Sequence, residues 1–182
     1  YKGSAYAPEV TEVLNQKDED VTGQFATKLD CTGDTTNKGS FYGVLIPSSG
    51  SRYTVDKTQE SNQIKFTIAP ATISKLTVNT GATSGETPVL KYGGSNTVPT
   101  FVSVNARLET GPTISLSENQ YSVTQITEVG EGKSCTVTVT DSENFSNNSG
   151  ANATVTYDVA YDLSSYMKLN QTAFTYQDKD LS

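Results

Sequence analysis

The sequence predicts an all-β protein, and three observations support this prediction. Thr (27), Ser (20) and Asn (12) supply 59 of the 182 residues, whereas Met appears once and Trp is absent. Such a composition favours short strands and turns over helices. The other two observations are segments in which apolar and polar residues alternate, and an internal repeat about as long as a small antiparallel β-sandwich.

Alternating segments mark the predicted strands. Residues 64–68, 135–139 and 155–159 alternate apolar with polar side chains, as half-buried strands do. Further strands are predicted at residues 9–14, 24–30, 40–46, 72–78, 99–104 and 121–126. Clusters of Pro, Ser and Gly separate them, and no window has convincing helical periodicity.

An internal repeat relates the two halves of the chain. Tyr1 and Tyr92 each open a segment with a Gly-Ser pair and a Pro seven residues after the Tyr. From Tyr1 to Phe66 and from Tyr92 to Tyr157 the separation is 65 residues in both cases. Because a repeat decides the whole architecture, this spacing predicts two similar units in tandem.

The closing strand of the first unit runs into the second as Phe-Thr-Ile-Ala-Pro-Ala-Thr-Ile at residues 66–73. With the Tyr-x-Gly-Ser…Pro opening, this order resembles the tandem immunoglobulin-like repeats of large bacterial cell-surface proteins. The resemblance covers essentially the whole chain, and its motifs are structural. The match is imperfect in its spacing, because the two units differ: Phe25 comes 17 positions after Pro8, whereas Tyr121 comes 22 positions after Pro99.

The resemblance implies two tandem Ig-like antiparallel β-sandwiches plus the first strand of a third repeat. The expected domains are residues 1–69, an Ig-like repeat that lacks its first strand, and residues 70–160, a second repeat. Residues 161–182 are expected to be the first strand of a following repeat or a donated tail strand. The resemblance also implies a place on the bacterial cell surface and a stalk or adhesin role, and it transfers no catalytic or binding residue.

The residue types indicate that the chain is not an enzyme and needs no cofactor. There is no histidine, which removes Ser-His and Cys-His pairs and the commonest zinc ligand. Cys135 alternates with valines and is expected to be a small buried residue, while Cys31 has an acidic neighbour that disfavours the thiolate. The acidic stretches 17–20 and 30–34 lack the spacing of a calcium loop and are predicted to be solvated turns. Lys65, Lys91 and Lys133 form no recognisable isopeptide pattern.

Charge and hydropathy restrict the partners. The formal net charge is −7, from 13 Lys+Arg against 20 Asp+Glu, and no basic run is present, so nucleic acid is not an expected partner. A membrane helix needs about 18 to 20 continuous apolar residues. No apolar stretch of this chain is that long, so this segment is not expected to insert into a membrane. A glycan or protein of a host or a cell wall remains a candidate partner, as does a second copy of the chain.

Three alternatives to the stalk stay open. The first is a self-assembling fibre subunit in which residues 163–176 are donated head-to-tail as an added strand. Its candidate donor residues are Leu163, Tyr166, Leu169, Phe174 and Tyr176. The second is a carbohydrate-binding module, for which the tyrosines without a repeat counterpart are the candidates: Tyr6, Tyr42, Tyr161 and Tyr166. The third is an Ig-like decoration domain of a phage.

Overall fold

A computed structural model describes residues 1–94, 97–146 and 151–162, and within these residues the protein is all-β. The prediction of the fold class is confirmed at this level, because the described residues contain no α-helix. The strands are β1 (Asp30–Cys31), β2 (Gly39–Val44), β3 (Ile64–Ile68), β4 (Ala71–Asn79), β5 (Val89–Lys91), β6 (Ser103–Leu108), β7 (Thr113–Ser115), β8 (Tyr121–Val123), β9 (Gly130–Val139), β10 (Phe145–Ser146) and β11 (Asn152–Ala160). Three short 3-10 helices, η1 (Thr22–Gln24), η2 (Glu60–Asn62) and η3 (Glu118–Gln120), lie between them.

Residues 1–69, called the N-terminal segment below, contain one three-stranded antiparallel sheet in the order β1-β2-β3. Phe41 lies opposite Phe66, and their rings are 5.8 Å apart, so these aromatic residues share one face of the sheet. Outside this sheet, the β-bridges of the segment are isolated ones, such as Glu9 with Lys28 and Phe25 with Pro47.

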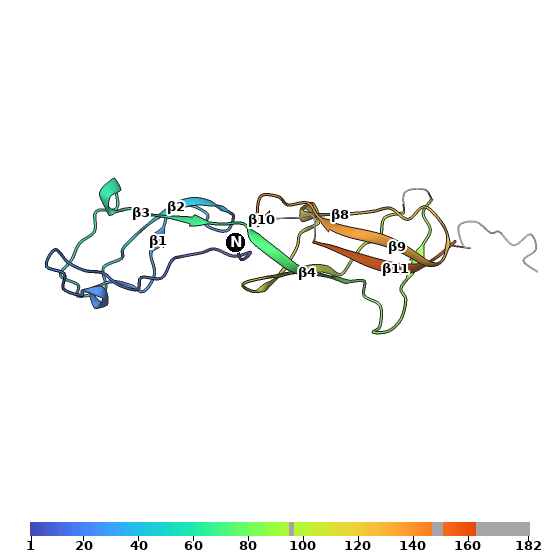
Figure 1. Ribbon diagram of the computed structural model, residues 1–182, viewed down its shortest axis with the longest axis horizontal. Helices are drawn as coiled ribbons and strands as arrows, with labels where there is room; N and C mark the ends of the chain where they lie inside the picture. Colours follow the sequence, from blue (N-terminus) through green and yellow to red (C-terminus); the bar gives the residue numbers. More distant parts are fainter. Residues whose placement is uncertain (95–96, 147–150, 163–182) are drawn as a thin grey trace, which may run out of the picture.

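Residues 70–162, called the C-terminal segment, contain two four-stranded sheets (Figure 1). One has the order β10-β4-β6-β7 and the other the order β5-β11-β9-β8. Two pairings are parallel, β10 with β4 and β5 with β11, while the others are antiparallel. The two sheets face each other across a shared core, so this segment is β-sandwich-like.

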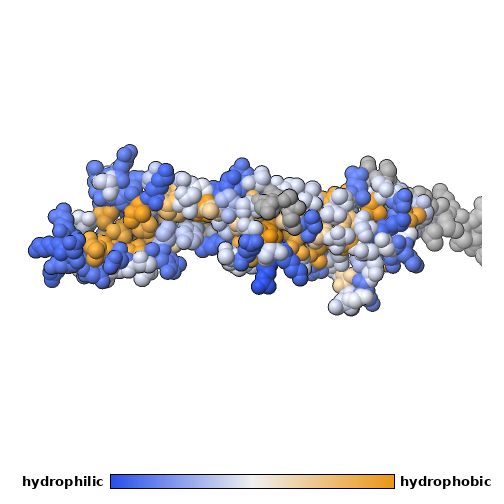
Figure 2. Space-filling model, in the orientation of Figure 1, coloured by the Kyte–Doolittle hydropathy of each residue, from blue (hydrophilic) through white to orange (hydrophobic). Residues whose placement is uncertain are grey.

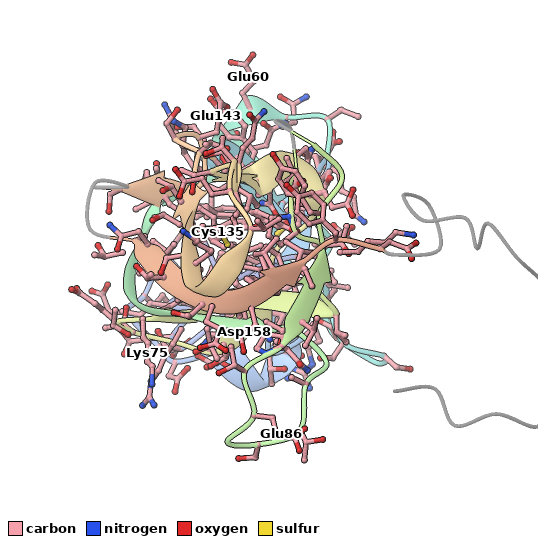
Figure 3. All side chains as sticks on the ribbon, turned by 90° about the vertical axis from the view of Figure 1, so that its right-hand side faces the viewer. Glu60, Lys75, Glu86, Cys135, Glu143 and Asp158 are labelled. Atoms are coloured by element: carbon pink, nitrogen blue, oxygen red, sulfur yellow. The ribbon has the colours of Figure 1, made fainter. Side chains whose placement is uncertain are left out.

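The core of the C-terminal segment draws its side chains from both sheets. The main cluster consists of Leu76, Val104, Ala106, Leu108, Leu116, Val137, Val139, Phe145 and Ala151. A second cluster contains Ile126, Cys135, Tyr157 and Val159. Figure 3, a view along the long axis, places Cys135 in the middle of this segment and Lys75, Glu86 and Glu143 around its periphery. The alternation at 135–139 and 155–159 therefore separates core from surface, and Cys135 is buried as expected.

The structure differs from the sequence-based expectation in the N-terminal segment. The predicted strands 9–14 and 24–30 form only isolated bridges and the two residues of β1. Val10 and Leu29 still make backbone hydrogen bonds that join these two parts of the chain, but the bonds do not continue into a regular ladder. The described residues of this segment hold one sheet, where the expectation was two packed sheets. In the C-terminal segment β6 begins at Ser103, later than the predicted 99–104, and β5 and β7 were not predicted.

Three turns of the N-terminal segment use the same Asp-x-Thr arrangement, at Asp20, Asp34 and Asp56. In each, the carboxylate accepts the backbone N–H of the threonine two residues later, which closes an Asx turn. A hydrogen bond from the side chain of the same threonine, together with this backbone bond, stabilises the carboxylate and lowers the pKa of each aspartate below its ordinary value. Local hydrogen bonds thus shape the loops that the sequence predicts as solvated turns.

The two segments lie end to end along the long axis of the molecule (Figure 1). The amino terminus lies where they meet, and β11 runs toward the end opposite the N-terminal segment (Figure 1). The junction therefore contains residues from the start, the middle and the later part of the chain.

Candidate functional site at the junction of the two segments

The connection between the two segments is short. β3 ends at Ile68 and β4 begins at Ala71, so only Ala69 and Pro70 separate a strand of one segment from a strand of the other. Proline fixes its own φ, and the residue before it is restricted to extended conformations. The linker is therefore stiff by composition as well as by length.

β10 adds a second attachment on the C-terminal side of the linker. Its Phe145 lies opposite Ala71 in a parallel pairing, and the Ala71 N–H donates to the Asn144 carbonyl at 2.9 Å. The hydroxyls of Thr72 and Ser146 are 2.9 Å apart beside it. These bonds to β10 therefore fix the first residues of β4, which directly follow the linker.

Asn144 joins the two segments directly and is 8% exposed. Its Oδ1 accepts the backbone N–H of Lys38 at 3.0 Å, and its Nδ2 donates to Asn37 Oδ1 at 3.2 Å. The same Nδ2 donates to Asp141 Oδ2 at 3.1 Å. One buried side chain therefore holds partners that lie 106 and 107 residues away in the chain.

Asp141 orients this amide. Its carboxylate also accepts a bond from Gln120 Nε2 at 2.8 Å and one from the Glu143 N–H at 3.0 Å. Burial acts to raise the pKa of Asp141, but the hydrogen bonds from Gln120 and Asn144 outweigh burial and hold the pKa below its ordinary value. The carboxylate is therefore ionised at neutral pH and serves as an acceptor in the network.

Tyr1 contacts both the linker and β10. Its amine donates to the Ala69 carbonyl at 2.6 Å, and its ring meets that of Phe145 edge to face at 5.3 Å. Gly3 has φ of 71°, and a Cβ there would lie 3.0 Å from Ile114 Cγ2. Glycine is required at this position because the chain is left-handed and close to the neighbouring segment.

Two hollows flank the junction. The larger, of about 820 Å³, is polar and includes Asn37, Asn119, Asp141, Glu143 and Asn144 in its lining. The smaller, of about 440 Å³, follows β3 and its lining includes Tyr1, Tyr6, Pro8, Phe66 and Ile68. In the described part of the chain no group of three or more His, Cys, Asp and Glu side chains is placed to hold a metal ion.

The three tyrosines predicted as glycan contacts that the structure describes, Tyr6, Tyr42 and Tyr161, are not brought together. Tyr6 is 43% exposed and lies 6.2 Å from the Phe66 ring, with Lys2 Nζ 5.1 Å from its own ring centre. Tyr42 is on β2 opposite Lys65, on the other face from Phe66, and Tyr161 packs edge to face on Tyr92. Tyr166 lies outside the described residues, as do the predicted strand-donor residues Leu163, Leu169, Phe174 and Tyr176.

The cysteines and lysines singled out in the sequence take ordinary positions. Both cysteines are free thiols, and burial raises the pKa of each, with the charge of Asp30 adding to the effect at Cys31. Lys91 pairs with Asp162, and Lys133 Nζ lies 2.9 Å from Glu128 Oε2. These are surface ion pairs.

Comparisons of this chain with protein-family models, with curated proteins and with solved structures find no significant match. None of the helices in the described part of the chain is long and apolar enough to cross a membrane.

Sequence reasoning missed the junction network. Asn144 is one of 12 asparagines, and nothing in its local sequence separates it from the others. The only available signal is its position immediately before Phe145, whose counterpart in the repeat is Tyr53.

Proposed function

We propose that this chain is a non-catalytic structural module, a stalk or adhesin repeat of a bacterial surface protein. The junction is the observation that supports this proposal, because a two-residue linker and the bonds of Asn144 to Lys38 and Asn37 restrict bending between the segments. The β10–β4 pairing fixes the strand that follows the linker. A stalk needs a fixed distance between its ends, and a stiff junction maintains that distance. The proposal includes the assignment of the two segments as Ig-like units.

The repeat in the sequence has a counterpart in the backbone, which supports the tandem assignment. The Tyr1 amine donates to the Ala69 carbonyl, and the Tyr92 N–H donates to the Ala160 carbonyl. Both bonds join residues 68 positions apart. A module built from similar units in series is suited to setting a length, because each unit contacts only its neighbours.

Small-angle X-ray scattering of the full chain tests the stalk role. The expected result is an elongated particle with one narrow distance distribution that is unchanged by added salts or sugars. The Asn144→Ala variant is expected to broaden that distribution, whereas Asn119→Ala, in the same hollow but exposed, is expected to leave it unchanged. A wild-type chain that samples many bend angles would contradict the proposal.

The surface location needs a separate measurement. An antibody raised against this chain is expected to label intact cells of the source organism without permeabilisation. Labelling that requires permeabilisation would place the protein elsewhere and would remove the stalk proposal.

A further inference from the structure

The larger hollow at the junction has the size of a small-ligand site. Its volume of about 820 Å³ falls within the roughly 300 to 1,000 Å³ that is usual for such sites. Asn37 lines it from the N-terminal segment, while Asn119 and Glu143 line it from the C-terminal segment. Ligand sites often form between two packed parts of a protein, and a molecule bound here would contact both.

Buried and half-buried side chains hold part of the lining in place. Both polar atoms of the Asn144 side chain are bonded to other protein groups. Asp141 accepts bonds from Asn144 and Gln120, and Gln120 Oε1 accepts the Ser117 N–H at 3.0 Å. This part of the hollow is therefore organised before a ligand arrives, which reduces the entropy that binding costs.

The exposed polar side chains of the lining are available to a ligand. In the described part of the chain, the Ser115 hydroxyl, the Asn119 amide and the Glu143 carboxylate make no hydrogen bond to other protein groups. Asn37 uses its Oδ1 to accept from Asn144, and its Nδ2 makes no further bond there. Amides, a hydroxyl and a carboxylate supply both donors and acceptors, so this set can bond to several hydroxyl groups at once.

The charges in the lining favour an uncharged ligand. Among the described residues that line the hollow there is no lysine or arginine, so a phosphate or carboxylate ligand would lack its usual partners. The two acidic residues, Asp141 and Glu143, belong to no metal-binding group in the part of the chain that the structure describes. A neutral ligand rich in hydroxyl groups matches the side chains that are present.

Apolar surface accompanies these polar groups. Tyr1 and Ile114 line the same hollow, and each is half-buried. Figure 2 shows hydrophilic residues beside hydrophobic ones over the middle of the molecule, where the two segments meet. A sugar ring carries hydroxyls around its edge and C–H groups on its faces, so it can use both kinds of surface, and an aromatic side chain suits the C–H face.

We propose that the larger hollow is a binding site for an uncharged oligosaccharide. The sugar hydroxyls bond to Asn37, Asn119 and Glu143, and a C–H face of the sugar packs against Tyr1 and Ile114. The site differs from the separate tyrosines that the sequence predicts as glycan contacts. The inference goes beyond the stalk role, because it gives the junction a ligand of its own.

Binding should stabilise the protein without changing its shape. A ligand that binds only the folded protein raises its stability through mass action. The linker and the Asn144 bonds already restrict bending, so the sugar is expected to leave the X-ray scattering unchanged. The measurement of binding is therefore independent of the measurement that tests the stalk.

Isothermal titration calorimetry of the full chain tests the site, with four neutral trisaccharides as probes. They are the trimers of glucose, mannose, galactose and N-acetylglucosamine. At least one is expected to bind with a dissociation constant of about 1 mM or tighter and to raise the melting temperature. Calcium chloride is titrated in the same way, because it tests the alternative that the two carboxylates take a cation.

Two variants test whether the sugar binds in the hollow. Asn119→Ala and Glu143→Gln are each expected to weaken binding by about fivefold to tenfold, because each weakens or removes a hydrogen bond to the sugar. Neither side chain bonds to other protein groups in the described structure, so both variants should keep the wild-type circular dichroism spectrum. The matched controls are Asn152→Ala and Glu86→Gln, which change exposed residues outside the hollow and should bind as the wild type does.

Three results would overturn the proposal. They are no binding of any trimer, trimer binding that Asn119→Ala and Glu143→Gln leave at the wild-type affinity, and calcium binding that Glu143→Gln abolishes, since the last would make the hollow a cation site. A chain that binds a trimer but samples many bend angles would remove only the stalk. A rigid chain that binds no trimer would remove only the sugar site.

Discussion

The backbone N–H of Tyr92 donates a hydrogen bond to the carbonyl of Ala160 at 2.8 Å, and this bond closes the parallel ladder of β5 on β11. At the junction the Tyr1 amine makes the equivalent bond to Ala69. The first bond completes a filled edge, whereas the second stands beside an open one. In both cases the bond joins residues 68 positions apart, so the two bonds occupy equivalent positions of the repeat.

The two segments are expected to differ in independent stability. Of the buried apolar side chains in the described residues, Phe25, Leu29, Val44 and Ile68 belong to the N-terminal segment and thirteen belong to the C-terminal one. Because burial of apolar area is the main source of stability, residues 70–162 alone should unfold cooperatively while residues 1–69 alone should not. Circular dichroism during urea titration measures both, and a cooperative transition of residues 1–69 would contradict this prediction.

Asn144→Ala should weaken the junction. The change removes three hydrogen bonds and leaves the Lys38 N–H and Asn37 side chain without their partner. The expected loss in the free energy of unfolding is about 1 to 3 kcal/mol. Urea denaturation measures this loss, and Asn119→Ala should change stability by less than about 0.5 kcal/mol because its side chain is exposed.

Asp141 should make the junction sensitive to acid. Its pKa is lowered in the folded protein, so the carboxylate adds stability above the ordinary aspartate pKa of about 3.9, and that stability is lost as the pH falls below it. Asp141→Asn cannot titrate and should show a shallower loss of melting temperature between about pH 4 and pH 2.

The control for this experiment is Glu86→Gln, because Glu86 is exposed at the periphery of the molecule (Figure 3) and lines neither hollow at the junction. This variant should follow the wild type. Equal acid sensitivity of Asp141→Asn and the wild type would show that Asp141 does not couple the junction to pH.

Removal of the Tyr157 hydroxyl should stabilise the protein. Its hydroxyl is buried without a hydrogen-bond partner among the described residues, and such a group costs roughly 1 to 3 kcal/mol. Tyr157→Phe should therefore raise the melting temperature. Tyr92→Phe is the matched control and should lower stability by about 1 kcal/mol, because the Tyr92 hydroxyl donates to the Thr127 carbonyl at 3.0 Å.

The same tyrosine should affect stability at high pH. Burial, with a smaller effect from Cys135, raises the pKa of Tyr157 to about 12. The unfolded chain ionises first, so stability should be lost as the pH rises from about 10 toward 12, and Tyr157→Phe should reduce this loss. Denaturation curves at pH 9 and pH 11 compare the two proteins, and parallel losses would contradict the assignment.

Local pattern predicts some elements well. The alternation at 64–68 and 155–159 correctly places β3 and β11, because a two-residue period is a property of the strand itself. The prediction for 9–14 is wrong as a strand, because a strand also needs a partner, and Glu9 and Leu14 find only single bridges. β5 has only three residues and is too short to carry a period.

The sequence by itself determined the all-β class, the inward residues of the long strands and the 91-residue offset between equivalent positions, because these properties depend on residue type and spacing. Only the tertiary structure decided which strand edges are filled, and it alone placed Asn144 between Lys38 and Asn37. Such contacts join residues more than 100 positions apart. Their geometry depends on how the segments fold against each other, and no local pattern encodes it.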